Sequence, residues 1–434
     1  MNRNIRIDYT NNMEKLKYDV VIIGGGTSGV ACAYMSSKLG LKTLLVEKSD
    51  VLGGAITQGL VIPCMNSDHK NINTDFYSDL ISYSKRFNSQ IEYSDGNKGW
   101  FNPELLKIVF DKMLFDVHCH VLFSSQVDRV MFNSQNNQFE LKILSRMLSL
   151  CIETIYLIDA TGYGKIFEIL NLKFQKKLKN EFQNPSLRFM ISNVNLKTFE
   201  NWIINFDKDR EVTSSCEVGG QIHLSTAYTW DKNKTWALRP IFQKAIENND
   251  LEEIDSAYFQ MFTVSFMPNT VSMNCPQIVL NRDIETPFEY SEALKEGREK
   301  VLRLHNFCKK YLKGFENSFI SHISDTLGVR EDRRVEGKYI YTIDDMLSGR
   351  TFENIAFAGD YPIDIHSKDE NVCKTKRQNY YVPLDCLMSK DYDNLFVIGR
   401  CLSADFQAQS ALRIQRHCFS MGEAVAKYIA HNRK

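Results

Sequence analysis

The segment 361–367, "YPIDIHS", combines a tyrosine, a carboxylate and a histidine in one short stretch. Histidine exchanges protons near neutral pH, and a neighbouring carboxylate can fix which ring nitrogen carries the proton. His366 and Tyr361 are therefore candidate catalytic residues, and Asp364 would orient the imidazole or brace the loop. A histidine with a purely structural role would leave the same pattern.

The segment 328–337, "GVREDRRVEG", carries Arg330, Arg333 and Arg334. A planar guanidinium can clamp a carboxylate through paired hydrogen bonds or stabilise an enolate. We take Arg330 and Arg334 as candidate catalytic residues that reach a substrate. The alternative is a charged turn held together by salt bridges. Arg413, near the C-terminus, is a further cation that could reach a cofactor or the interface between domains.

Cys64, in "GLVIPCMN", could form a covalent bond to a cofactor or lie buried as a free thiol. No partner cysteine follows at short spacing, which favours the buried thiol. The eleven cysteines of the chain form no C-x-x-C pair and no metal-ligand spacing, so we expect no metal site. Unpaired thiols in a chain without a secretory signal indicate a cytoplasmic protein.

Helices and strands must position these candidate side chains, and the clearest pattern for such elements lies near the start of the chain. Residues 19–23, "DVVII", predict a buried parallel strand. Gly24 would allow the tight turn that follows, Gly26 the close approach of a pyrophosphate, and Gly29 the packing of helix on strand. The helix would open near Thr27 and Ser28, presenting free N–H groups to the phosphates.

A second strand, "TLLVE", ends in Glu47, which lies 18 residues after Gly29, close to the spacing at which a carboxylate can receive ribose hydroxyls. The turn is therefore predicted to bind a dinucleotide. Lys48 follows the acid directly, and a second loop of small residues, Gly53-Gly54-Ala55, comes soon after. A second glycine-rich loop at this place suits FAD bound in an extended form.

Taken together, these motifs resemble the FAD-dependent oxidoreductases of the glutathione-reductase-like Rossmann superfamily, and the resemblance extends over nearly the whole chain. It implies FAD as the cofactor. The similar segments are "FNPELLKIVFDKML" (101–114), "VLFSSQVDRVMF" (121–132), "IYLIDATGYGKI" (155–166), "LGVREDRRVEGKYIYTIDDM", "FAGDYPIDIH" and "NLFVIGRCLSADFQAQSALRIQRHCFSMGEAVAKYIA" (394–430).

The resemblance also assigns cofactor contacts to the later segments. It implies that the backbone at Val127 receives the adenine, that Ala160, Thr161 and Gly162 lie beside FAD, and that Gly399 and Arg400 lie at its phosphate–ribityl end. The backbone of Gln409, Ser410, Ala411 and Leu412 would lie near the pyrimidine side of the flavin. Ser410 and Ala411 replace the Gly-Ser typical of the group, so Ser410 could crowd the flavin edge. A helix beginning near Ala411 would direct its N-terminus at a reduced flavin.

The expected architecture is an α/β protein. A Rossmann-like FAD-binding domain, three-layered with a parallel sheet, would be assembled from residues 18–168 and 346–434. Residues 169–345 would form an α+β substrate domain, and residues 1–17 a flexible N-terminal tail. The 199–266 stretch contains aromatic residues that would form either the domain core or the wall of a pocket for a bulky or aromatic substrate: Trp202, Tyr228, Trp230, Trp236, Tyr258 and Phe262.

Composition limits the partners. The chain has 434 residues, of which 53 are basic and 53 acidic, so charge gives no support for binding nucleic acid or an anionic membrane. No apolar run is long enough to span a membrane. The composition is compatible with a monomer and with a homo-oligomer.

We therefore predict an FAD-dependent oxidoreductase of the dehydrogenase or oxidase type, which transfers a hydride to or from flavin N5 and acts on a small molecule. No second dinucleotide fingerprint is found, so oxygen, a quinone, another protein or a transiently bound nicotinamide could exchange electrons with the flavin. The alternatives are a flavin-dependent monooxygenase using NAD(P)H and oxygen, and a flavin-binding redox protein without turnover.

Overall fold

The computed structural model describes residues 16–67, 72–92, 97–146, 148–179, 181–229, 234–280, 283–367 and 378–433, and the main chain of 371–373. Its largest sheet contains a parallel part in the order β5-β2-β1-β8-β19 and an antiparallel hairpin, β6-β7, joined to β8. The strands are β1 (Leu16–Ile23), β2 (Thr43–Val46), β5 (His120–Leu122), β6 (Ser125–Asn133), β7 (Gln138–Ser145), β8 (Ser149–Asp159) and β19 (Leu395–Val397).

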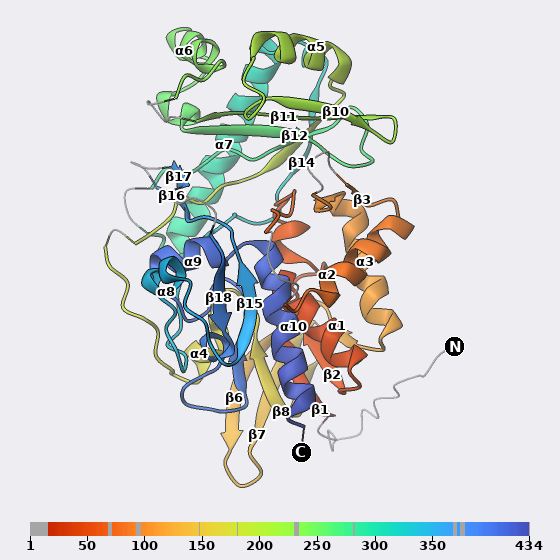
Figure 1. The fold of residues 1–434 in the computed structure, drawn as a ribbon, viewed down its shortest axis with the longest axis vertical. Helices are drawn as coiled ribbons and strands as arrows, with labels where there is room; N and C mark the ends of the chain where they lie inside the picture. Colours follow the sequence, from red (N-terminus) through yellow and green to blue (C-terminus); the bar gives the residue numbers. More distant parts are fainter. Residues whose placement is uncertain are drawn as a thin grey trace.

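Both faces of this sheet are buried, as the apolar run in β1 predicts. Val20 and Ile22 belong to one core cluster and Val21 and Ile23 to another. Helices cover the first face (Figure 1): α1 (Thr27–Lys38), α2 (Asp75–Arg86), α3 (Pro103–Asp116) and α10 (Gln415–His431). Helix α10 packs closely on α1, since a Cβ added to Gly422 would lie 2.3 Å from the carbonyl oxygen of Ser28.

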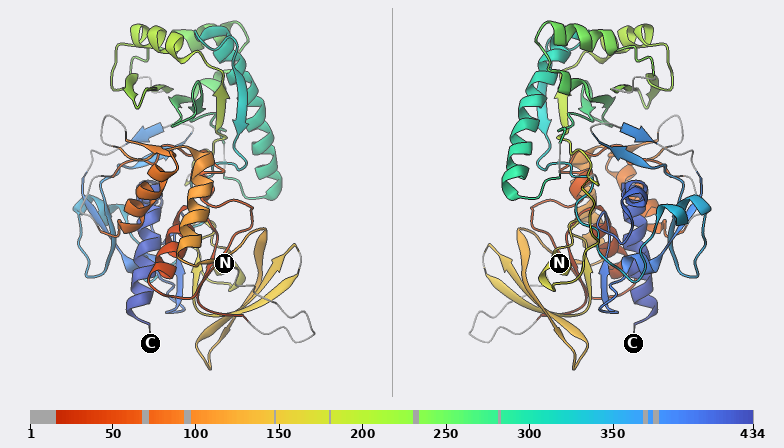
Figure 2. Two further views of the ribbon diagram at one scale, coloured as in Figure 1. Left: turned by 90° about the vertical axis from the view of Figure 1, so that its right-hand side faces the viewer. Right: turned by 90° about the vertical axis from the view of Figure 1, so that its left-hand side faces the viewer.

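A second sheet lies at the other end of the molecule (Figures 1 and 2). It is antiparallel, in the order β10-β11-β12-β13-β9-β14. The strands are β9 (Phe189–Ser192), β10 (Ser214–Val218), β11 (Gln221–Thr229), β12 (Tyr258–Thr263), β13 (Val271–Met273) and β14 (Phe319–Ile323); the helices packed with them are α5 (Leu196–Phe206), α6 (Arg239–Glu247) and α7 (Pro287–Tyr311). Helix α7 begins with a capping box formed by Thr286 and Glu289.

Short elements complete the fold, and their strands pair with one another in three separate two-stranded sheets. These are β3 (Gln90–Ile91), β4 (Trp100–Phe101), α4 (Lys165–Ile169), α8 (Ile343–Ser348), β15 (Ile355–Gly359), β16 (Asp364–His366), β17 (Asn371–Cys373), β18 (Tyr380–Pro383) and α9 (Phe406–Leu412), with short 3-10 turns at Gly54–Ile56, Glu253–Ser256 and Leu384–Leu387. Figure 1 shows β16 and β17 between α9 and the second sheet.

The α/β architecture and its parallel sheet are confirmed. The domain boundaries at 168 and 345 stay predictions, and of the expected tail all but Leu16 and Lys17 lie outside the described residues. Trp230 also lies outside them. Among the helices that the structure describes, none is both long enough and apolar enough to cross a membrane.

The predicted start of a helix near Ala411 is wrong. Helix α9 begins at Phe406, because the side chain of Asp405 caps it by accepting a hydrogen bond from Ala408 N at 2.7 Å. Ala411 therefore lies in the last turn of α9. The backbone is extended at Ile414, and α10 begins at Gln415.

Candidate functional site

The glycine turn after β1 has the geometry of a phosphate-binding loop. Gly24 has a φ of +106°, and a Cβ there would lie 2.5 Å from the carbonyl oxygen of Ala160. A Cβ on Gly29 would lie 1.9 Å from the carbonyl oxygen of Gly24, so helix and turn need a glycine at this position. A Cβ on Gly26, by contrast, would meet no atom of the described residues within 4 Å. Space for a ligand therefore opens over Gly26, at the start of α1.

The first backbone N–H groups of α1, at Thr27 and Ser28, have no acceptor within the helix. The hydroxyl of Thr27 donates a 3.2 Å hydrogen bond to Gly53 O, so the loop of Gly53 and Gly54 crosses the turn beside the start of α1. A Cβ on Gly54 would lie 3.1 Å from the Cα of Gly26. Ala55 follows in the same short turn.

Glu47 lies at the end of β2 with its carboxylate fixed beside the turn. It accepts hydrogen bonds from Gly25 N at 2.6 Å and from Ser49 N at 2.8 Å. Such a buried, oriented carboxylate suits a ribose hydroxyl. Lys48 is exposed and lies 5.2 Å from the centre of the Tyr163 ring.

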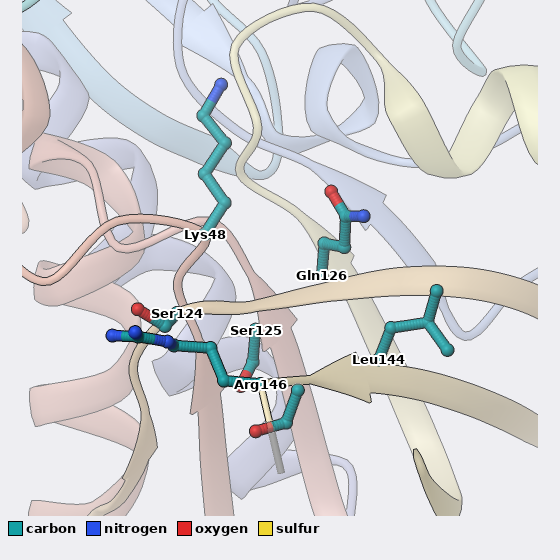
Figure 3. A pocket seen from close by; sticks show the side chains of 7 residues that line it. Lys48, Ser124, Ser125, Gln126, Leu144 and Arg146 are labelled. Atoms are coloured by element: carbon teal, nitrogen blue, oxygen red, sulfur yellow. The ribbon is translucent and has the colours of Figure 1, made fainter. Parts of the chain in front are cut away.

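A cavity of about 230 Å³ is lined by Lys48, which follows Glu47, and by residues of β6 and β7. Figure 3 shows Lys48, Ser124, Gln126 and Arg146 around it. Val127, the predicted adenine contact, follows Gln126 in β6. The cavity therefore borders the strand to which the adenine contact was assigned, and that contact stays a prediction.

The end of β8 is held by a buried carboxylate. Asp159 accepts hydrogen bonds from Thr161 N, Thr161 Oγ1 and Ile166 N at 3.1, 2.6 and 2.8 Å. This fixes the turn of Ala160, Thr161 and Gly162. The side chain of Arg400 lies against it and donates to the carbonyl oxygen of Gly162 at 2.8 Å.

The C-terminal segment reaches the start of α1. Gly399 has a φ of +94°, and a Cβ there would lie 3.0 Å from the hydroxyl of Ser28. Gln409 is fully buried and donates to Arg400 O at 2.9 Å, whereas its Oε1 has no hydrogen-bond partner among the described residues. A flavin carries an N3–H donor of the kind that this oxygen lacks.

The hydroxyl of Ser410, in place of the expected glycine, is bound to the protein itself. It donates to Gln407 O at 2.7 Å and accepts from Asp364 N at 3.3 Å. Ala411 and Leu412 are buried beside it. Together with the open space over Gly26 and the free Oε1 of Gln409, these residues fit FAD.

A second group of functional side chains lies where β16 and α9 meet the second sheet. We call it the interface cluster, and it comprises Arg188, Tyr258, Arg330, Asp364, His366 and Arg413. Arg413 donates to Asp364 Oδ2 at 3.0 Å, and His366 Nε2 lies 3.0 Å from Asp364 Oδ1. The side chains of Asp364, Arg413 and His366 are 23%, 15% and 12% exposed, so a small molecule can reach the cluster.

His366 has a partner on each ring nitrogen. Gln277 Nε2 lies 2.9 Å from Nδ1, and Nε2 faces Asp364, which defines a neutral ring that carries its proton on Nε2. Burial and the charge of Arg330 lower the pKa of His366. Burial opposes ionisation of Asp364, but His366, Arg413 and Arg330 outweigh it and hold the pKa of this carboxyl well below its usual range. The ring of Tyr258 packs edge-on against His366 with centroids 5.6 Å apart.

The structure shows other contacts for Arg334 and Tyr361, and their catalytic role stays a prediction. Arg334 is buried and forms ion pairs of 2.7 Å with Glu331 and with Glu181. Tyr361 accepts a hydrogen bond from Tyr380 through its carbonyl oxygen at 3.1 Å. Burial raises the pKa of Cys64 to about 12, so its thiol is a poor nucleophile near neutral pH.

The sequence did not draw attention to Arg188, Gln183 or Asn184, which also lie at this interface. Arg188 donates to Leu60 O and Ile62 O, each at 3.3 Å. The sequence feature that could have indicated Arg188 is a charged residue directly before an apolar strand, in "LRFMIS". Of the predicted aromatic wall, Tyr228 and Phe262 belong to hydrophobic cores, and Tyr258 contacts the interface cluster.

The fold and the site thus define a flavoprotein of the Rossmann type. The chain belongs to the FAD dependent oxidoreductase family, whose model matches residues 19–434. This confirms the family, the oxidoreductase class and FAD as the cofactor.

Curated relatives share short segments. Digeranylgeranylglycerophospholipid reductase of Methanococcus vannielii is 38% identical over 64 residues, which cover 15% of this chain and 16% of the relative. Dihydrolipoyl dehydrogenase of Trypanosoma brucei brucei is 39% identical over 70 residues, covering 16% and 14%. The matched segments are therefore a small part of these relatives' own length.

Solved structures match over more of the chain but at low identity. A geranylgeranyl bacteriochlorophyll reductase-like protein from Thermoplasma acidophilum has a TM-score of 0.46 and 13% identity, with 96% of this chain and 79% of that chain covered. L-proline dehydrogenase from P. horikoshii has a TM-score of 0.44 and 12% identity, with 96% and 93% covered.

Proposed function

We propose that the protein transfers a hydride between a small organic molecule and FAD, in the manner of a dehydrogenase or oxidase. The observation that carries this proposal is the interface cluster. It joins residues of the second sheet to Asp364, His366 and Arg413, and the Ser410 hydroxyl accepts from Asp364 N in the segment expected to contact the flavin. Ionisable groups here would lie beside both substrate and cofactor.

When bound, FAD would supply the hydride acceptor or donor at N5. The chain itself would manage the proton that the substrate loses. His366 is neutral, and Asp364 holds its Nε2–H, as in an aspartate–histidine pair. A substrate hydroxyl or amine would replace the amide of Gln277 at Nδ1, and Asp364 would stabilise the imidazolium that forms.

Anaerobic stopped-flow absorbance tests this function. The FAD-loaded protein is mixed with small organic molecules and, separately, with NADH and NADPH, and the oxidised flavin band near 450 nm is followed. Bleaching by an organic molecule supports a dehydrogenase or oxidase. Bleaching by a nicotinamide alone contradicts the proposal and favours a monooxygenase or reductase.

A further inference from the structure

The interface cluster holds more positive than negative charge. Arg413 is paired with Asp364, and the second oxygen of Asp364 faces the neutral His366. Arg330 is 9% exposed, and within the described residues its side chain makes one hydrogen bond, to the carbonyl oxygen of Asn184. Arg188 likewise donates to carbonyl oxygens, and within the described part of the chain it has no carboxylate partner.

The three guanidinium groups lie close enough to repel one another. Burial and the charges of Arg413 and Arg188 lower the pKa of Arg330 to about 9, and burial lowers that of Arg188 to about 10. Each remains protonated at neutral pH. Buried cations without a counter-ion are costly, so this arrangement is one that an anion would stabilise.

Hydrogen-bond donors are in excess as well. In this region the buried donors without a partner among the described residues are Arg188 Nε, Arg413 Nε, Gln183 Nε2 and Asn184 Nδ2. Gln183 is joined to the cluster through its Oε1, which accepts from His366 N at 3.3 Å and lies 3.5 Å from Arg413. A ligand rich in acceptor oxygens would satisfy these donors.

We infer that the interface cluster binds the carboxylate group of a small organic acid through Arg188, Arg330 and Arg413, and that the substrate is such an acid. This inference rests on the proposed function. Planar guanidinium groups match a carboxylate in geometry as well as in charge. The carboxylate would anchor one end of the molecule and leave its oxidisable carbon beside His366.

The test measures binding separately from turnover. FAD-loaded protein is titrated with benzoate and with butanoate, and in parallel with benzamide and butanamide, at constant ionic strength. Sulfate serves as a simple anion. Calorimetry gives the dissociation constant, and the unfolding midpoint gives an independent readout because a ligand of the native state raises it. The variants are Arg330→Gln, Arg413→Gln and Arg188→Gln.

Arg333→Gln is the matched control. Arg333 lies three residues from Arg330 but is 36% exposed and paired with Glu168 at 2.7 Å. We expect the carboxylates to bind and the amides not to bind. Arg330→Gln and Arg413→Gln should weaken carboxylate binding by about tenfold or more, and Arg333→Gln should leave it unchanged. If Arg330→Gln does not fold, Arg188→Gln provides the same comparison.

Three outcomes would overturn the inference: equal binding of amides and carboxylates, sulfate binding as tightly as the carboxylates, or variants that lose FAD while retaining carboxylate affinity. The last would assign the arginines to the cofactor. Flavin bleaching by an uncharged compound, with carboxylates inert, would remove the inference and leave the proposed function intact. Conversely, if carboxylates bind but only a nicotinamide bleaches the flavin, the proposed function is contradicted while the carboxylate site is retained.

Discussion

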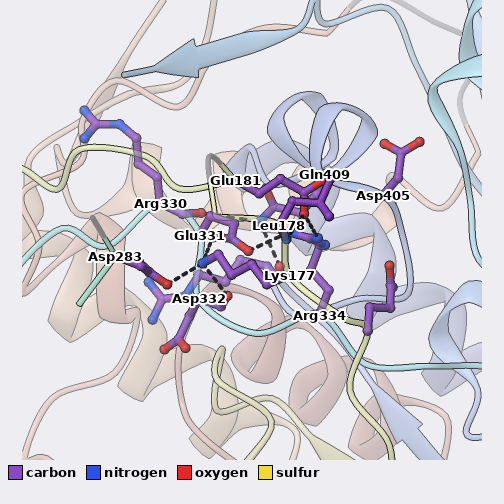
Figure 4. Close-up of polar contacts among 12 residues, drawn as sticks. Lys177, Leu178, Glu181, Asp283, Arg330, Glu331, Asp332, Arg334, Asp405 and Gln409 are labelled. Carbon is purple, nitrogen blue, oxygen red and sulfur yellow. Dashed lines mark hydrogen bonds and ion pairs between the residues drawn. The ribbon is translucent and has the colours of Figure 1, made fainter. Parts of the chain in front are cut away.

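Arg330 and Arg334 are four residues apart in one segment, yet their surroundings are opposite in charge. Arg334 belongs to what we call the balanced network, because each of its two cations is paired with carboxylates: Lys177 with Asp283 and Glu331, and Arg334 with Glu331 and Glu181. Arg330 belongs to the interface cluster, where three guanidinium groups share one carboxylate. Figure 4 shows Arg330 directed away from Lys177, Glu331 and Arg334. The comparison separates an arginine that stabilises the fold from one that we propose binds a ligand.

The largest effect should come from breaking the balanced network. Arg334→Gln would leave the fully buried carboxylate of Glu331 without one of its two cations, and removing one partner of a buried ion pair costs about 3–5 kcal/mol. Arg330→Gln should change stability by no more than about 1 kcal/mol, because it removes one hydrogen bond and relieves repulsion between cations. Urea unfolding measures both. Equal losses in the two variants would contradict the distinction.

For turnover, the order of the two regions should reverse, and a change in the interface cluster should have the larger effect. His366→Gln is expected to slow flavin reduction by substrate by about 10²-fold or more, since a positioned general base contributes this much, while FAD stays bound. Glu331→Gln, a change of similar size in the balanced network, should leave the rate nearly unchanged. Single-turnover reduction kinetics at saturating substrate separate the two. An unaltered rate in His366→Gln would remove this residue from the mechanism.

Asp364→Asn makes the interface cluster still richer in positive charge. It should lower the free energy of unfolding by about 2 kcal/mol, as expected for a partly accessible charged hydrogen-bond partner of Arg413. It should also tighten the binding of benzoate, because one competing anion is removed. Calorimetry at constant ionic strength checks the second effect. Weaker benzoate binding would indicate that Asp364 positions Arg413 for the ligand.

The sequence predicted the nucleotide site better than the interface cluster, and the reason is physical. The turn of Gly24, Gly26 and Gly29 with the carboxylate of Glu47 lies within one strand–helix–strand unit, so spacing along the chain encodes its geometry. The interface cluster draws on β16, α9, the loop before β9 and the segment after β14. No local pattern distinguishes Arg330 from Arg334, because their difference arises from residues far away in the chain.

Stability across pH should separate the two regions through opposite pH dependences. Burial raises the pKa of Glu331 from its ordinary 4.5 to about 7 despite Lys177 and Arg334, so its contribution to stability is present below pH 4.5 and is lost as pH rises through 7. Burial lowers the pKa of His366, so the contribution of this residue to stability is present above its ordinary pKa of 6.5 and is lost as pH falls below that value.

Relative to the wild type, Glu331→Gln should therefore gain stability as pH rises from 4.5 to 7. His366→Gln should gain as pH falls below 6.5. Unfolding midpoints across this range measure both slopes, and parallel slopes would show that the two regions do not differ in the way that their charges indicate.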